Sequence, residues 1–308
     1  MEIDAGILLR CRHDQRQTRR QRILHQRVRR PHRSLRQGGD RPQGRGLSVT
    51  ASPSPLIDVC DVKKEFRSRS GTSLVALADT SLGVAANQFI CIVGPSGCGK
   101  STLLRMIAGL ETASAGAIRI DGASVNGPRR DIGLVFQSPV MLPWRTILQN
   151  VTVPAEVMKL DAATTKRRAG ELLELVGLGG FGDRYPDELS GGMRQRAAIA
   201  RALMHDPRIL LMDEPFGALD ALTREAMNLE LLRIWEASRK TVVLVTHSIE
   251  EALLLSDKVA VFAPRPGFVR EVIDVPIARP RSAATRSDPT FVALAERLRG
   301  HFTAVPAA

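Results

Sequence analysis

The sequence predicts an α/β fold in which helices cover both faces of a largely parallel sheet. Three short and mainly apolar runs, at 89–93, 208–212 and 241–245, are typical of strands that are buried on both faces. Helical patterns bracket these runs, and buried strands that alternate with helices form parallel sheets. The chain has 308 residues, 44% apolar and 25% charged, which is enough for one large domain or two small ones.

The first 50 residues differ in composition from the rest of the chain. They contain 13 Arg, no Lys and 4 acidic residues, giving +9, whereas residues 51–308 carry 31 basic and 28 acidic side chains, giving +3. The segment has no aromatic residue and few large apolar ones, so burial cannot offset its loss of chain entropy. We therefore expect residues 1–54 to form a disordered, Arg-rich tail that ends in a Ser-Pro-Ser-Pro linker.

Three interpretations of this tail are compatible with its sequence. In the first it is inert, or a translated leader whose true start lies near Leu47 or Val49, at a non-AUG codon because the next methionine is Met106. In the second its arginines contact nucleic acid or anionic lipid headgroups. In the third it is a targeting segment, since its Arg-rich, acid-poor composition resembles an organelle transit peptide.

The folded body begins near residue 56, where apolar and polar residues alternate as in strands. The strand predicted at 89–93 is followed by a glycine loop and then by a helical pattern. From about 151 to 204 the pattern is helical throughout, which predicts an inserted α-helical subdomain. The C-terminal extension, 276–308, is expected to contain one capped helix over 288–302.

Two further helices are predicted next to the later strands, over 222–238 and 249–255. Ser248 and Glu251 fit the S-x-x-E form of a capping box, so the second of these helices should begin directly after His247. The histidine then lies at the end of a strand, on the edge of the sheet that faces a ligand.

The sequence indicates neither a membrane span nor a structural zinc site. The longest unbroken apolar runs, such as 89–93 and 259–263, fall far short of the ~18 to 20 residues that a spanning helix needs. The cysteines have neither CxxC spacing nor the density of a disulfide scaffold, so we expect reduced thiols in a cytosolic protein. They are Cys11, Cys60, Cys91 and Cys98.

One motif has the spacing of a phosphate-binding loop, G-x-x-x-x-G-K-[ST], and follows a buried strand and opens a helix, as such a loop must. Its backbone N–H groups can close on a phosphate chain, and the helix N-terminus adds partial positive charge. Lys100 should reach the outer phosphates, and the Ser101 hydroxyl can ligate magnesium. The motif is Gly94-Pro95-Ser96-Gly97-Cys98-Gly99-Lys100-Ser101.

Two adjacent acidic residues, Asp213 and Glu214, end the buried strand that starts at 208. Carboxylates at a strand terminus are costly unless a positive group lies beside them, and magnesium is the natural partner next to a phosphate-binding loop. We expect Asp213 to hold the ion, directly or through water. Glu214 should face the attacking water as a general base or a polarising carboxylate.

The second glycine motif, LSGGMRQR at 189–196, resembles the signature of ATP-binding cassette (ABC) ATPases. Ser190, Gly191 and Gly192 open a helix with exposed N–H groups, which makes an anion site without a lysine of its own. In the family this site serves the nucleotide of the opposite subunit. The resemblance therefore implies a homodimer that encloses two ATP molecules.

The other motifs of the family follow in the expected order. Gln137 matches the glutamine loop, Asp220 matches the D-loop, and His247 matches the switch histidine at the terminal phosphate. Phe66 aligns with the aromatic residue on which the family stacks adenine, although a core or edge-strand position would also explain it. The resemblance implies catalytic residues Glu214, His247 and Gln137, magnesium contacts Ser101, Gln137 and Asp213, and ATP contacts Phe66, Gly94 to Thr102, Ser190, Gly191, Gly192 and Asp220.

The resemblance covers residues 56–275 and implies an ATP-binding domain over 55–275 with the P-loop NTPase fold of ABC ATPases. This fold has a mostly parallel sheet with flanking helices, an antiparallel β subdomain and an inserted α-helical subdomain. The lack of spanning segments excludes exporters fused to a membrane domain, and the single motif set argues against twin-cassette translation factors. A separate import ATPase fits best.

Within the family, residues 142–146, 189–196 and 263–267 resemble the nitrate, sulfonate and taurine import branch. That branch implies a peripheral ATPase at the cytoplasmic face of the plasma (inner) membrane that energises uptake of an aliphatic sulfonate, taurine or nitrate. Its partners would be integral membrane permease subunits and a periplasmic or extracellular solute-binding protein. The permease would dock at Met141 and Trp144, unless these side chains pack internally.

A hypothesis from another class is a soluble ABC-type ATPase that acts with nucleic acid through its basic tail. Salt-sensitive binding to DNA or RNA that disappears on deleting residues 1–50 would favour it. A scaffold without activity is disfavoured because every expected catalytic position is filled. The sequence does not specify the transported solute, since a cassette subunit never touches it.

Overall fold

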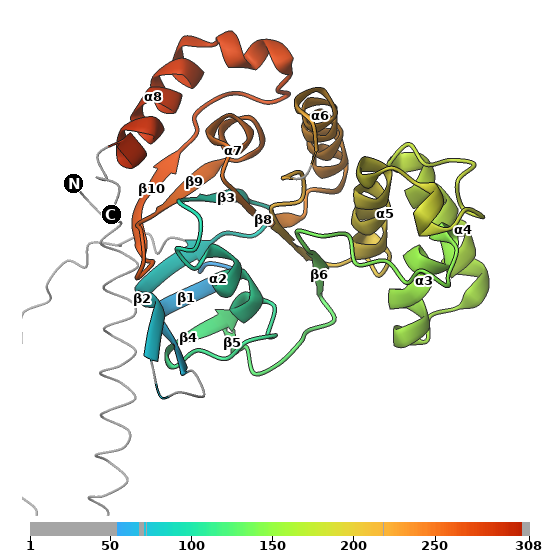
Figure 1. The fold of residues 1–308 in the computed structure, drawn as a ribbon, viewed down its shortest axis with the longest axis horizontal. Coiled ribbons are helices and arrows are strands. Elements are labelled where there is room, and N and C mark those ends of the chain that lie inside the picture. The colour runs from blue at the N-terminus through green and yellow to red at the C-terminus, as the bar shows by residue number, and fades with distance from the viewer. Residues whose placement is uncertain (1–53, 68–70, 72, 218, 304–308) are drawn as a thin grey trace, which may run out of the picture. The chain divides into compact units, whose positions relative to one another are not determined.

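The computed structural model describes residues 54–67, 71, 73–217 and 219–303. The expected disordered tail, 1–54, thus lies outside the described residues apart from Ser54. Figure 1 shows the arrangement of the elements. They are, in order, β1 (Ile57–Arg67), β2 (Ser73–Val84), β3 (Phe89–Val93), α2 (Lys100–Ile107), β4 (Ala115–Ile120), β5 (Ala123–Ser124), β6 (Ile132–Val135), α3 (Ile147–Met158), α4 (Ala162–Leu175), η1 (Pro186–Glu188), α5 (Gly191–Leu203), β7 (Ile209–Asp213), α6 (Ala221–Ser238), β8 (Thr241–Thr246), α7 (Ile249–Leu255), β9 (Lys258–Phe262), β10 (Val269–Asp274), η2 (Ala283–Ser287) and α8 (Pro289–Thr303).

The larger of two sheets has six strands in the order β10-β9-β3-β8-β7-β6. Neighbouring strands from β9 to β6 pair in parallel, and β10 runs antiparallel to β9. The predicted mostly parallel sheet is therefore confirmed. The smaller sheet, in the order β2-β1-β4-β5, is antiparallel, as the family resemblance implied.

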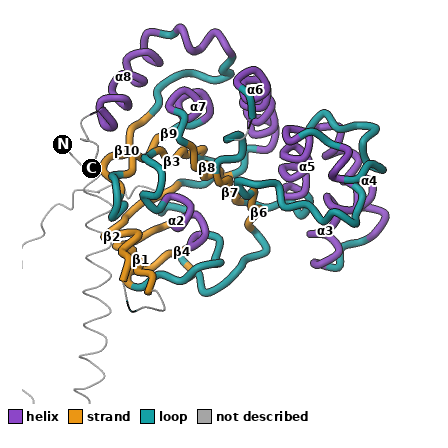
Figure 2. Tube along the Cα trace, viewed as in Figure 1, coloured by secondary structure: helices purple, strands orange, loops and turns teal. Residues whose placement is uncertain are grey.

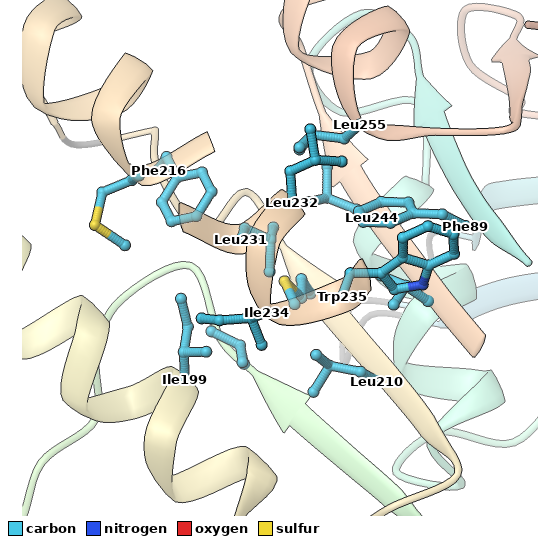
Figure 3. Packing of buried hydrophobic residues seen from close by; sticks show 14 of the residues in the cluster. Phe89, Ile199, Leu210, Phe216, Leu231, Leu232, Ile234, Trp235, Leu244 and Leu255 are labelled. Atoms are coloured by element: carbon cyan, nitrogen blue, oxygen red, sulfur yellow. The ribbon is translucent and has the colours of Figure 1, made fainter. Parts of the chain in front are cut away.

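Alternate residues of each central strand face two different apolar layers. On β3, Phe89 and Val93 face a layer that α5, α6, α7 and α8 help to form, whereas Ile90 and Ile92 face α2 and the antiparallel sheet. Figure 3 shows Trp235 of α6 against Phe89, and their ring centroids lie 5.8 Å apart in an edge-to-face contact. Because strand β3 is buried on both faces, the loop that follows it starts from a rigid base.

Helices α3, α4 and α5 occupy the stretch where the sequence predicts a helical insertion, and Figure 2 shows them grouped beyond β6. The first of them begins at Ile147, before the expected boundary near 151. The reason is a capping box: the N–H of Gln149 donates to the Thr146 hydroxyl, and the Gln149 side chain accepts from the N–H of Thr146.

The last helix, α8, spans the stretch for which the sequence predicts one helix, and it packs against α7. The Asp288 carboxylate precedes it and accepts a hydrogen bond from the N–H of Thr290. Between β10 and α8, the buried Arg281 donates to backbone carbonyls at the C-terminal end of α7. Burial lowers the pKa of Arg281 to about 10.

The described part of the chain contains no helix that is both long and apolar enough to cross a membrane. Cys91 and Cys98 are free, buried thiols, and burial raises the pKa of each. The prediction of reduced thiols is confirmed at these two positions. The Sγ of Cys60, on β1, lies 3.2 Å from the Asp58 Oδ1. Cys11 lies outside the described residues.

Candidate functional site

Strands β3, β6, β7 and β8 end at the same edge of the larger sheet, and predicted site residues follow each of them. The register pairs Val93 at the end of β3 with Thr246 at the end of β8, and Asp213 at the end of β7 with Val245. Strand β6 joins the same parallel ladder beside β7. The carboxyl ends of parallel strands are where α/β proteins place their ligands. Parallel pairing therefore gathers the glycine loop, the acidic pair, Gln137 and His247 along one edge.

The glycine loop at 94–99 connects β3 to α2. Gly97 and Gly99 have φ angles of 74° and 98°, a region that favours glycine. A Cβ at Gly99 would also lie 2.7 Å from the Leu77 side chain. Lys100 is 5% exposed, and its ammonium group donates to the carbonyls of Gly94 at 2.8 Å and Pro95 at 3.0 Å. The first turn of α2 then presents the hydroxyl residues 101 and 102.

The Ser101 hydroxyl donates to the Oδ1 of Asp213 at 2.7 Å, which joins the start of α2 to the end of β7. Asp213 is 6% exposed, and burial raises the pKa of its carboxyl group. A hydroxyl and a carboxylate are the hard oxygen ligands that Mg²⁺ prefers, and a further positive charge would offset the cost of burying the carboxylate. The pair therefore fits a magnesium ion that also contacts phosphate.

Glu214 and His247 contact each other across the ends of β7 and β8, with 3.2 Å between the Glu214 Oε2 and the His247 Nδ1. The N–H of Glu214 donates to the Val245 carbonyl at 2.9 Å. Glu214 has a φ of 43°. Residues other than glycine rarely adopt this backbone conformation, and those that do are often found at functional sites. The chain thus holds a carboxylate and an imidazole together just beyond the sheet edge.

A second carboxylate, Glu251, lies beside this pair, and sequence reasoning assigns it only a capping role. Glu251 and Ser248 form one half of the predicted capping box, because the N–H of Glu251 donates to the Ser248 hydroxyl. The Glu251 side chain instead accepts from the Thr246 hydroxyl, and its Oε1 is buried without a hydrogen-bond partner among the described residues. Burial raises the pKa of this carboxyl group, so Glu251 holds its proton more tightly than an exposed glutamate.

The signature residues lie at the start of α5 and line a separate cavity of about 620 Å³ together with Thr223 of α6. Ser190 is exposed and caps the helix, because its hydroxyl accepts from the N–H of Met193 at 3.3 Å. Asp220 caps α6 in the same way, accepting from the N–H of Thr223 at 3.0 Å, and this hydrogen bonding lowers its pKa. Within one chain, the signature and the phosphate loop therefore form two distinct sites.

Two predicted residues lie at the borders of the site. Gln137 is exposed and follows the end of β6 by two positions. Phe66 lies near the end of β1 in the antiparallel sheet, is 38% exposed, and has the Lys64 ammonium 4.7 Å from its ring centroid. Phe66 is therefore not a core residue, and its ring is accessible to a flat ligand.

Comparison with known proteins gives a consistent result. Residues 77–217 match the family model for the ABC transporter. An uncharacterized ABC transporter ATP-binding protein of Methanocaldococcus jannaschii is 49% identical over 212 residues, which is 69% of this chain and 79% of that protein. The taurine import ATP-binding protein TauB of Pelagibacter ubique is 44% identical over 213 residues (69% and 80%). The aliphatic sulfonates import ATP-binding protein SsuB 2 of Burkholderia lata is 42% identical over 255 residues (83% and 89%).

Solved structures agree with these relatives. A dimeric ATP-binding cassette in a post-hydrolysis state, bound to ADP and Pi, superimposes with a TM-score of 0.65 and 33% identity. The match covers 72% of this chain and 100% of that one. These findings confirm the family resemblance that the two glycine motifs predict. The chain belongs to the ATP-binding proteins of the ABC transporter family and is an ATPase.

Proposed function

We propose that this chain is the ATP-hydrolysing subunit of an importer and that it drives uptake of a small solute. The observation that carries this proposal is the gathering of Lys100, the Ser101–Asp213 pair and the Glu214–His247 pair at one sheet edge. Relatives at 42% and 44% identity are named as import ATP-binding proteins. The chain would work as a peripheral protein on the cytoplasmic face of the plasma membrane.

Each group at the sheet edge has a distinct role in this proposal. The N–H groups of the loop residues 94–102, other than Pro95, and the Lys100 ammonium bind the β- and γ-phosphates of ATP. Ser101, Asp213 and Gln137 would hold Mg²⁺, which neutralises part of the triphosphate charge when bound. Glu214 orients the attacking water and accepts its proton, while His247 fixes the Glu214 carboxylate and reaches the terminal phosphate.

The second anion site supports a dimeric mode of action. Ser190, Gly191 and Gly192 present the N-terminus of α5 on an exposed surface, and this helix end lacks the lysine of a complete triphosphate site. Two copies arranged head to tail would place this helix end of one copy on the γ-phosphate held by Lys100 of the other. Solved cassettes with 33% and 34% identity are dimeric. Closure around two ATP molecules and reopening after hydrolysis would be the two states that the permease converts into transport.

An apolar surface after Gln137 is the proposed docking site for the permease. The Trp144 side chain is 72% exposed, and Val140 nearby is also exposed. Met141, by contrast, packs partly against the large apolar layer, so of the two predicted docking residues Trp144 is the more accessible to a partner. A contiguous patch of exposed apolar side chains on a folded domain marks an interaction site. This surface follows β6 directly, so a bound permease would be coupled to Gln137 at the nucleotide site.

The solute that we propose is an aliphatic sulfonate, taurine or nitrate, delivered to the permease by a solute-binding protein. The names of the relatives support a sulfonate or taurine. The rival hypothesis of a nucleic-acid-dependent ATPase rests on the basic tail, which lies outside the described residues. Residues 51–308 carry only +3, so the folded body offers little electrostatic attraction for nucleic acid. We do not propose that activity.

A strain that lacks this chain tests the proposed function. We expect it to lose growth on taurine or ethanesulfonate as sole sulfur source, or on nitrate as sole nitrogen source, and to keep growth on sulfate and ammonium. The wild-type chain should restore growth, whereas Trp144→Ala should not, although its ATPase activity without the permease is intact. Normal growth of the deletion strain on all of these sources would contradict the proposal.

A further inference from the structure

The segment 263–267, between β9 and β10, lies directly against the phosphate-binding loop. The Arg265 guanidinium donates two hydrogen bonds to the Gly97 carbonyl, from Nε at 3.0 Å and from Nη2 at 2.9 Å. Gly267 lies so close to the next residue of the loop that a Cβ on it would be 1.7 Å from the Cys98 carbonyl oxygen. Two consecutive carbonyls of the loop are therefore in contact with one short segment 168 residues away.

The same segment is also fixed to the antiparallel sheet. The N–H of Gly267 donates to the Ala76 carbonyl at 3.0 Å, and the Gly267 carbonyl accepts from the N–H of Ala78 at 2.9 Å. The Thr80 hydroxyl donates to that carbonyl as well. These three partners belong to β2, the strand that pairs with β1 and its exposed Phe66. Segment 263–267 thus connects the phosphate loop to the antiparallel sheet, which carries the proposed adenine contact at Phe66.

A phosphate-binding loop works only if its N–H groups point at the ligand, which requires its carbonyls to be held elsewhere. Lys100 holds the carbonyls of Gly94 and Pro95. At Gly97 the backbone has positive φ and no side chain to restrain it, and Arg265 supplies the restraint. Two donors from one rigid guanidinium fix an acceptor better than a single ammonium can. The guanidinium also adds a positive charge beside the loop.

We propose that Arg265 is a positioning residue that orients the phosphate-binding loop for the triphosphate of ATP. Gly267, two residues further along, joins the same segment to the antiparallel sheet. The proposal rests on the proposed nucleotide site at 94–102. Arg265 acts through the Gly97 carbonyl and through its charge, so its loss should weaken ATP binding and leave the chemistry at Glu214 largely unchanged.

The test measures KM for ATP and kcat separately in the full-length protein carrying Arg265→Gln or Arg265→Lys, and compares both with wild type. Arg265→Gln removes the charge and the two-pronged contact, and we expect KM to rise about fivefold to twentyfold, less than for a buried charged pair because the side chain is exposed. The Arg265→Lys variant keeps the charge, so its KM should rise less. In both variants kcat should stay within about twofold of wild type, because the groups that act on the attacking water are untouched.

Three comparisons make the result decisive. Arg130→Gln removes an exposed arginine before the start of β6, at the opposite edge of the sheet, and should leave KM unchanged. Hydrogen exchange of the amides at 94–102 without nucleotide should be faster in Arg265→Gln than in Arg130→Gln. If KM and loop exchange in both Arg265 variants equal those of Arg130→Gln, or if kcat falls as far as KM rises, the inference is wrong. Lys100→Ala separates the two proposals: if it too leaves ATP binding intact, the proposed nucleotide site itself fails.

Discussion

Replacing Glu214 with Gln is expected to abolish most ATP turnover while ATP binding persists. The amide has nearly the same shape and can still accept a hydrogen bond from His247, whose Nδ1 lies 3.2 Å from the Glu214 Oε2. The amide cannot accept a proton from the attacking water, and the loss of a general base lowers kcat about 10²-fold to 10⁴-fold. Phosphate release under saturating ATP measures the first effect, and equilibrium ATP binding measures the second.

The matched control for this substitution is Glu171→Gln on α4. Glu171 forms an exposed ion pair with Arg167 at 3.9 Å, a contact that contributes little to stability. This variant should hydrolyse ATP like the wild type. If Glu214→Gln also retained wild-type turnover, Glu214 would not be the residue that activates water.

Replacing Lys100 with Ala is expected to weaken ATP binding. The substitution removes a buried positive charge from the phosphate loop and releases the Gly94 and Pro95 carbonyls that the ammonium group holds. The loss of a charge-assisted contact to phosphate in a largely buried site should raise the Kd for ATP about tenfold to a hundredfold. Lys166→Ala, an exposed lysine on α4, is the control and should bind ATP normally. Unchanged ATP affinity and hydrolysis in Lys100→Ala would refute the assignment.

Much of the larger sheet can be predicted from the sequence because its signal is local. Strand 89–93 and helix 249–255 end where the apolar patterns end, since each pattern reflects burial of the element itself. The positions of Asp213 and His247 follow in turn, because parallel strands bring their carboxyl ends to one edge. The Ser101–Asp213 contact is compatible with the proposal that both residues bind magnesium.

Contacts that depend on tertiary packing are not visible in the sequence. The S-x-x-E pattern gives no sign that Glu251 turns away from the Ser248 backbone to accept from the Thr246 hydroxyl, because both arrangements need the same residues. Arg265 stands in a segment that resembles the import branch, yet its hydrogen bonds to Gly97 appear only once β9 is paired with β3.

The central claim is that two copies of the chain bind each ATP together, one through the loop at 94–102 and the other through the N-terminal end of α5 at 190–192. Gly191→Glu is suited to test this claim. A Cβ at Gly191 meets no atom within 4 Å, and an acidic residue in the first turn of a helix is favourable for folding. Its negative charge would nevertheless repel the phosphate of the partner's ATP.

The measurement is the molar mass of the Glu214→Gln protein in solution with magnesium and ATP, by light scattering. The account predicts an ATP-dependent dimer for Glu214→Gln and for its combination with Gly191→Ala. It predicts a monomer that still binds ATP when Glu214→Gln is combined with Gly191→Glu. An ATP-dependent dimer of undiminished stability in this last variant would contradict the shared site.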